Sequence, residues 1–223
     1  MNILRITEDF IQFENDNTYA EEIDQLGKET IYMKINNYKI NSLKIPRHIV
    51  YLDCSNNKLE TLPELPDSLV YLICGGNHLE TLPELPDRIF YLDCSPNKLV
   101  FLPELPDNLE KLNCSINQLG SLPEIPKSLK FMECSINQLK FLPELPFNLK
   151  WLICCDNNLQ SLPELPDSLV NLNCCNNNLK SLPELPDSLE KLNCSINHLK
   201  SLPALPNRLI KLSAHLNPIT FGL

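Results

Sequence analysis

Apolar residues recur along this chain with a period of twenty positions. The string LPELPDS begins at residues 62, 162 and 182, and close relatives of it begin at 82, 102, 122, 142 and 202. The repeating unit reads LPELPxxLxxLxCSxNxLxx. A fixed period of this length is typical of repeat architectures, in which each unit buries its apolar face against its neighbours. The pattern therefore predicts a solenoid.

Within each unit, apolar and variable positions alternate over a short stretch. Leu72 and Cys74 alternate with Tyr71, Ile73 and Gly75. Successive side chains of a strand point to opposite faces. Because Leu and Cys recur in nearly every unit, with Ala214 in place of Cys in the last, we expect them to face the core of a parallel sheet. The intervening positions should face outward on the concave side of the solenoid.

An asparagine follows each predicted strand without a miss, from Asn57 to Asn217. The chain must turn inward there, which leaves backbone N–H and C=O groups near the core. A buried amide side chain can both donate to and accept from such groups. We therefore interpret this column as structural.

The LPELP segments predict an extended return arm on the convex side. Two prolines separated by two residues disfavour a regular helix and favour polyproline-II geometry, and 16 of the 19 prolines lie in these arms. The arms carry a regular set of acidic residues: Glu64, Glu84, Glu104, Glu124, Glu144, Glu164 and Glu184, followed by Asp67, Asp87, Asp107, Asp167 and Asp187. A solvated face is the favoured interpretation, and an acidic strip for a basic partner is the alternative.

The motif LxxLxCxxNxL resembles the core of leucine-rich repeats. The LPELP half and the 20-residue period resemble the bacterial-type class, which occurs in type III secreted effectors and in leucine-rich repeat proteins of large amoebal viruses. The resemblance covers roughly residues 30–223. It implies a curved leucine-rich repeat superhelix with a parallel β-sheet on its concave face, and a role in binding other proteins. Some members of this class carry a ubiquitin-ligase domain, which we expect to be absent because the chain stops six residues after Asn217.

The predicted organisation has two parts. Residues 1–29 form an N-terminal cap with a short helix near 18–27, where Thr18 and Glu21 match a capping box. Residues 30–223 form the repeats: a degenerate first unit at 30–48, then nine 20-residue units, the last one truncated.

Net charge limits the classes of partner, and targeting signals bear on the cellular compartment. The formal net charge of −9 disfavours nucleic acid and anionic membranes, both of which attract basic proteins. The first residues lack a secretory signal, and the sequence contains no run of 18 or more apolar residues that could span a membrane. We expect a reducing cytoplasm, either that of the producing cell or that of a host.

Outward positions next to the core leucines suggest a binding surface. The first column is largely aromatic, and the next is polar; together they supply the candidate partner-binding residues Tyr51, Tyr71, Tyr91, Lys111, Phe131, Trp151, Asp53, Asp93, Asn113 and Glu133. Exposed aromatic clusters are typical anchors in recognition, and Lys111 lies between rings, in place for a cation–π contact. A protein partner is the favoured hypothesis. A carbohydrate ligand and a structural assembly role are the alternatives.

The chain has ten cysteines, which could serve in packing, metal binding or redox chemistry. Eight follow the repeat period and are predicted to be buried apolar residues, without the close CxxC pairs of zinc sites. Cys155 and Cys175 replace the usual serine and are expected to point outward, where a redox or metal role is conceivable but less favoured than simple substitution. Because no phosphate loop, HExxH motif or nucleophile–base spacing is present, we predict a protein that is not an enzyme and needs no cofactor.

Overall fold

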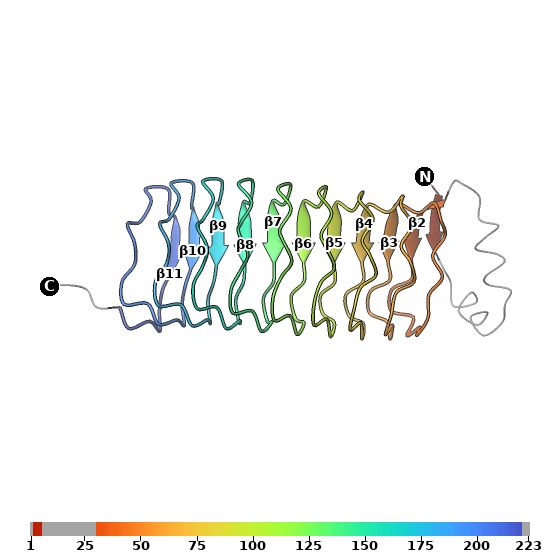
Figure 1. Ribbon diagram of the computed structural model, residues 1–223, viewed down its shortest axis with the longest axis horizontal. Helices are drawn as coiled ribbons and strands as arrows, with labels where there is room; N and C mark the ends of the chain where they lie inside the picture. Colours follow the sequence, from red (N-terminus) through yellow and green to blue (C-terminus); the bar gives the residue numbers. More distant parts are fainter. Residues whose placement is uncertain (1, 6–29, 220–223) are drawn as a thin grey trace.

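The strands of the protein form one continuous sheet along its long axis (Figure 1). A computed structural model describes residues 2–5 and 30–219, and the predicted helix near 18–27 lies outside these residues. The strands are β1 (Asn2–Arg5), β2 (Thr30–Lys34), β3 (Tyr51–Asp53), β4 (Tyr71–Ile73), β5 (Tyr91–Asp93), β6 (Lys111–Asn113), β7 (Phe131–Glu133), β8 (Trp151–Ile153), β9 (Asn171–Asn173), β10 (Lys191–Asn193) and β11 (Lys211–Ser213). They pair in chain order, and every pair is parallel.

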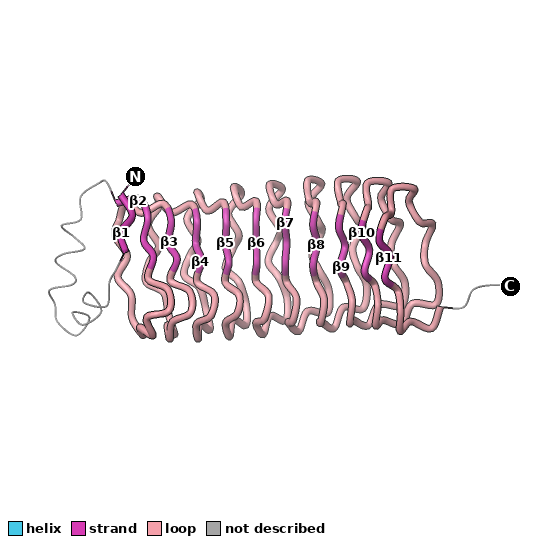
Figure 2. The backbone as a smooth tube through the Cα atoms, turned by 180° about the vertical axis from the view of Figure 1, so that it is seen from behind, coloured by secondary structure: helices cyan, strands magenta, loops and turns pink. Residues whose placement is uncertain are grey.

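The sequence period sets the register of the sheet. Tyr71 pairs with Tyr91 and Leu72 pairs with Leu92, so equivalent positions of successive units stand side by side. Between residues 30 and 219 the chain outside the strands forms turns and extended segments, with no helix (Figure 2). The architecture is a parallel β-solenoid, as the repeat predicts. In this part of the chain no helix has the length and hydropathy that crossing a membrane would require.

The core consists of stacked apolar columns. Leu72, Leu92 and Leu112 are fully buried, and so are the cysteines two positions later in each of these units, Cys74 to Cys114. Full burial of a leucine side chain contributes about 2 kcal/mol of transfer free energy, and each column repeats this burial from unit to unit. The prediction that the eight regularly spaced cysteines pack in the core is confirmed.

The asparagine column ties neighbouring units together through backbone groups. The Nδ2 group of Asn77 donates to the carbonyl oxygens of Cys54 and Cys74, each at 3.0 Å. Its Oδ1 atom accepts the backbone N–H of Leu59 at 3.0 Å. These repeated hydrogen bonds form an asparagine ladder. The degenerate first unit takes part in it, because Tyr38 donates its backbone N–H to Asn57 Oδ1 at 3.0 Å. The predicted structural role of this column is confirmed.

The turn before the asparagine has a left-handed backbone in the repeat units, except at Pro96. Asn56 and Gly76 adopt positive φ there, which Asn and Gly tolerate well. Ile116, Ile136 and Ile196 occupy the same position with φ of 54°, 54° and 56°. A β-branched residue is unusual in this conformation, so the hydrogen-bonded turn imposes its geometry against the preference of the side chain.

The solenoid presents two faces that differ in composition. The sheet face carries the outward side chains of β2 to β11, and the arm face carries the LPELP segments. On the arm face, the leucines at the first position of most arms, such as Leu62 and Leu142, are buried, Leu122 and Leu202 are half-buried, and the glutamates between the prolines are exposed. The arm acids therefore face solvent, as predicted.

Candidate binding surface on the sheet face

Four tyrosines from consecutive strands form a continuous aromatic row on the sheet face. The ring centroids of Tyr32 and Tyr51 lie 5.5 Å apart, those of Tyr51 and Tyr71 lie 6.0 Å apart, and those of Tyr71 and Tyr91 lie 6.2 Å apart. Phe90, just before β5, approaches Tyr71 at 5.8 Å. The planes of the tyrosine pairs are tilted by 31° to 38°, within the range of favourable aromatic contacts. We call these five residues the aromatic row.

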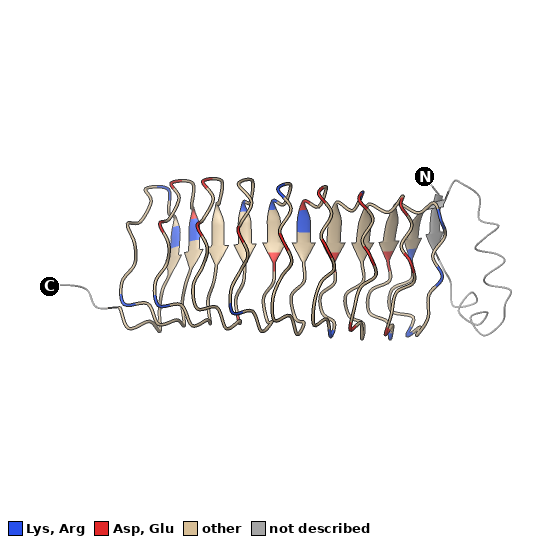
Figure 3. Cartoon of the chain, in the orientation of Figure 1, with Lys and Arg blue, Asp and Glu red and all other residues tan. Residues whose placement is uncertain are grey.

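A second aromatic pair lies further along the same face. Phe131 on β7 and Trp151 on β8 have ring centroids 6.3 Å apart. Lys111 on β6 stands between this pair and the aromatic row, and Figure 3 shows blue on this strand. The sheet face therefore offers two apolar areas with one cation between them.

The predicted cation–π contact of Lys111 is not observed. In the described part of the chain, the lysine that lies over a ring is Lys34, whose Nζ atom is 5.2 Å from the centroid of Tyr51. Lys34 comes from β2, so the first repeat contributes a cation as well as Tyr32 to this surface.

The aromatic side chains are partly accessible. Tyr71 is 37% exposed and Trp151 is 41% exposed, while Tyr51, Tyr91 and Phe131 are half-buried against their neighbours. Partial burial raises the pKa of Tyr51 and of Tyr91, with a smaller contribution from the nearby aspartates. Such rings are held in place before a partner arrives, which lowers the entropy cost of binding.

Asp53 does not belong to the accessible polar column. The prediction placed it outward, but it is 8% exposed. Its Oδ1 atom accepts hydrogen bonds from the backbone N–H of Ser55 at 3.1 Å and from the Ser55 hydroxyl at 2.7 Å. The carboxylate therefore caps its own turn and is not free to contact a partner.

Asp93, Asn113 and Glu133 form the polar border of the aromatic area. They are half-buried at the ends of β5, β6 and β7. Burial raises the pKa of Asp93 and that of Glu133, and for Glu133 the charge of Asp93 adds to the effect. This border carries negative charge in a partly dry setting, where a basic or hydrogen-bonding group of a partner would be attracted.

Cys155 is also less accessible than predicted. It is 7% exposed, and its thiol donates to the carbonyl oxygen of Asn173 at 3.7 Å. Burial and the neighbouring Cys175 raise the pKa of the Cys155 thiol to about 12. The outward direction was inferred from strand alternation, but position 155 lies beyond β8, in the turn that Ser115 and Ser195 also fill while buried. Cys175 is half-buried.

Metal binding or nucleophilic catalysis would require reactive side chains gathered at an accessible place. Across residues 2–5 and 30–219, no three His, Cys, Asp or Glu side chains come together as metal ligands would. The hydroxyl of Ser195 lies 2.9 Å from Nδ1 of His215, but Ser195 is 1% exposed. A serine so deeply buried cannot reach a substrate, so we interpret the pair as a turn hydrogen bond.

Three contributors to this surface lie outside the predicted set of partner-binding residues. Tyr32 and Lys34 come from the degenerate first unit, and Phe90 comes from the position before β5. The first two were detectable, because placing Met33 in the core column puts its two neighbours in outward positions. The proximity of Phe90 to Tyr71 is a diagonal contact between adjacent strands, which the column pattern alone does not reveal.

Buried leucine columns, an asparagine ladder and a parallel sheet with one strand per unit define a leucine-rich repeat solenoid. With 20-residue units and LPELP arms, the chain is a leucine-rich repeat protein of the bacterial type.

The comparisons with solved structures agree with this class. YopM from Yersinia enterocolitica WA-314 is 36% identical with a TM-score of 0.72, over 87% of this chain and 48% of that one. YopM from Yersinia pestis, described as a leucine-rich effector protein, is 37% identical with a TM-score of 0.72, over 82% and 60%. A Shigella effector leucine-rich repeat domain is 40% identical with a TM-score of 0.53, over 56% and 58%.

This chain thus spans about half to three fifths of the length of those structures. No family model matches it, and neither does any curated protein.

Proposed function

We propose that this chain is a non-catalytic protein-interaction module that binds a protein partner on its concave sheet face. The carrying observation is the aromatic row, in which rings from four consecutive strands touch and remain partly open to solvent. Large, pre-ordered aromatic side chains dominate the energetics of many protein interfaces. The similarity to bacterial effectors supports a host-directed role in a cytoplasm.

The surroundings of the rings suit a protein partner. A salt bridge of 2.7 Å between Lys130 Nζ and Glu110 Oε1 joins two units beside Lys111 and Phe131. Asp93 and Glu133 of the polar border lie at the opposite, C-terminal ends of β5 and β7. An apolar centre with a charged rim is the usual anatomy of a protein interface.

The test uses substitutions that the repeat itself tolerates. Asn171 occupies on β9 the position of Tyr71 and Trp151, so Tyr71→Asn and Trp151→Asn should preserve the fold. A photo-activatable cross-linker at Lys111 would be used to capture partners from a eukaryotic cell lysate. We expect one protein to be cross-linked by the parent chain and to be lost, at least tenfold, from the double variant.

A matched control carries the cross-linker at Asp67 on the arm face, where the same protein should not be captured. Unchanged capture by the double variant, together with a sharply lowered melting temperature, would show that the rings are packing residues. Because Trp151 is accessible, a glycan array is screened in parallel. Array binding that disappears with Trp151→Asn, with no protein captured, would replace the protein partner by a carbohydrate.

A further inference from the structure

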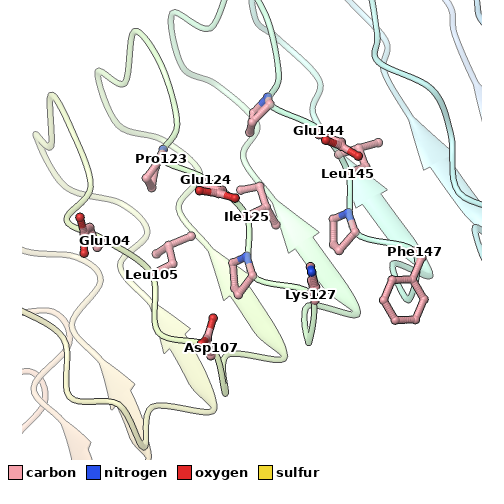
Figure 4. A pocket seen from close by; sticks show the side chains of 13 residues that line it. Glu104, Leu105, Asp107, Pro123, Glu124, Ile125, Lys127, Glu144, Leu145 and Phe147 are labelled. Atoms are coloured by element: carbon pink, nitrogen blue, oxygen red, sulfur yellow. The ribbon is translucent and has the colours of Figure 1, made fainter.

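A second concave feature lies on the arm face, away from the strands. Three consecutive arms, at residues 103–107, 123–127 and 143–147, enclose a groove with a volume of about 880 Å³. Figure 4 shows side chains of all three arms arranged around it. Its volume falls within the range of about 300 to 1,000 Å³ that is usual for ligand sites. We call it the arm groove.

The repeat pattern changes at this groove. The position after the second proline of the arm is aspartate at 67, 87, 107, 167 and 187 and asparagine at 207, but it is Lys127 and Phe147 in two of the three arms that line the groove. Phe147 is 66% exposed, at a position where five other arms carry an aspartate. Together with the other lining residues Leu105, Ile125 and Leu145, Phe147 extends an apolar area along the groove.

The groove combines an apolar floor with an anionic rim. Leu105, Ile125 and Leu145 lie between the prolines of the three arms, and Ile125 and Leu145 are buried. The charged lining consists of Glu104, Asp107, Glu124, Glu144 and Lys127. Four carboxylates and one ammonium give the groove a formal charge of −3.

We propose that the arm groove binds an extended, positively charged peptide segment, with an apolar side chain of the peptide against Phe147. The charge of the rim selects basic residues and repels nucleic acid phosphates. The floor runs across arms that are themselves extended, so an extended chain can follow it from one arm to the next. Regularly placed glutamates then meet successive basic side chains, while the floor and Phe147 bury apolar ones.

Lys127 gives the proposal a test in two directions. It is the one cation of the lining, so it should weaken binding of a basic peptide. Lys127→Asp restores the residue seen at Asp107 and changes the formal charge of the groove from −3 to −5. This substitution should tighten binding. Phe147→Asp also adds negative charge and restores the repeat residue, but it removes the apolar contact and should weaken binding.

The experiment measures fluorescence anisotropy with a labelled nine-residue probe peptide in which Lys-Pro-Leu occurs three times. A second peptide with glutamate in place of each lysine is the control and should not bind. We expect Lys127→Asp to lower the Kd about threefold, Phe147→Asp to raise it at least fivefold, and Glu124→Lys with Glu144→Lys to raise it at least tenfold.

A matched double variant, Glu64→Lys with Glu184→Lys, makes the same charge change on arms outside the groove and should alter the Kd less than twofold. Equal weakening by both double variants would show that general electrostatics, and not the groove, holds the peptide. Absence of binding to the parent chain, or an unchanged Kd for Phe147→Asp, would overturn the proposal. Tyr71→Asn should leave peptide binding intact, so this inference and the proposed function can fail separately.

Discussion

The side chain of Asn137 is hydrogen-bonded to the backbone of Cys114 in the preceding repeat: its Nδ2 group donates to the Cys114 carbonyl oxygen at 3.1 Å. The same amide donates to Cys134 in its own repeat at 3.1 Å and accepts the backbone N–H of Leu119 at 3.0 Å. One side chain thus completes the hydrogen bonding of two adjacent units. Such a ladder explains why the asparagine recurs while the turn residues around it vary.

Asn137→Ala should destabilise the protein by about 2 to 3 kcal/mol, because it leaves the buried N–H of Leu119 without its acceptor and opens a small cavity. Urea unfolding followed by circular dichroism measures the change. The neighbouring Gln138 is exposed, so Gln138→Ala should cost less than about 0.5 kcal/mol. If the two variants unfold at the same urea concentration, the ladder is not what stabilises the turn.

The left-handed turn makes a second prediction at Ile136, whose φ is 54°. Ile136→Ala and Ile136→Gly remove the same side-chain contacts, except for one methyl group. At most positions glycine is less stable than alanine, by roughly 0.5 to 1 kcal/mol, but at positive φ the order reverses. We expect Ile136→Gly to be the more stable of the pair by about 1 kcal/mol in thermal melts.

The alanine and glycine substitutions are repeated at a position with negative φ, as a control for Ile136. At the exposed Gln138, which is not among the positive-φ positions, Gln138→Ala should be at least as stable as Gln138→Gly. An alanine variant that exceeds the glycine variant at both positions would show that the turn relaxes to negative φ once isoleucine is gone.

The fold was predictable from the sequence because one period controls every level of it. The recurrence of Leu, Cys, Asn and LPELP determines which positions are buried, where the strand ends and where the chain returns. A register error of one residue would expose the whole leucine column, so few alternatives remained. Leu72, Cys74 and Asn77 accordingly lie where the pattern predicts.

The details of the surface were less predictable, for reasons that lie in side-chain geometry. Asp53 bends back to its own turn, and Cys155 lies in a turn where strand alternation no longer applies. Lys34 and not Lys111 reaches a ring, because the reach of a long side chain depends on its rotamer. The arm groove depends on the space between three arms, and a linear pattern does not contain that space.

The polar border of the sheet face makes a prediction about pH. Burial raises the folded-state pKa of Asp93, so its charge destabilises the fold as pH rises from the unfolded pKa through the folded one. Asp93→Asn removes this charge. It also keeps the turn, because Asn113 accepts the N–H of Ser115 at 3.1 Å just as Asp93 accepts that of Ser95 at 3.1 Å. We expect Asp93→Asn to be more stable at pH 7 by a few tenths of a kcal/mol, up to about 1 kcal/mol.

The gain should shrink on acidification, because the parent aspartate then becomes neutral as well. Melting temperatures between pH 3 and pH 7 measure this convergence. Asp67→Asn on the exposed arm makes the same change in net charge and controls for it. A stabilisation by Asp93→Asn that persists unchanged at pH 3 would mean that the carboxylate charge is not its cause.

The regularly spaced cysteines predict that stability falls steeply in alkaline solution. Burial raises the pKa of the Cys54 thiol to about 12 and that of Cys194 to about 11, and it raises the pKa of the thiols between them in the same column as well. In the unfolded chain these thiols ionise from about pH 9 upward, whereas in the fold they stay protonated. The unfolded state therefore loses protons first, and stability declines by about 1.4 kcal/mol per pH unit for each such thiol.

Comparison with Cys74→Ala isolates one thiol from the tyrosines and lysines that titrate in the same range. Alanine is compatible with this column, because Ala214 fills it in the last unit. The free energy of unfolding, obtained from urea titrations between pH 8 and pH 10.5, should fall less steeply for Cys74→Ala than for the parent chain. The difference in slope should be about 1.4 kcal/mol per pH unit above pH 9. Cys175→Ser provides the matched control, since Cys175 is half-buried and lies outside the column. If Cys74→Ala and the parent chain lose stability at the same rate, the column thiols are accessible to hydroxide in the fold and their packing role is wrong.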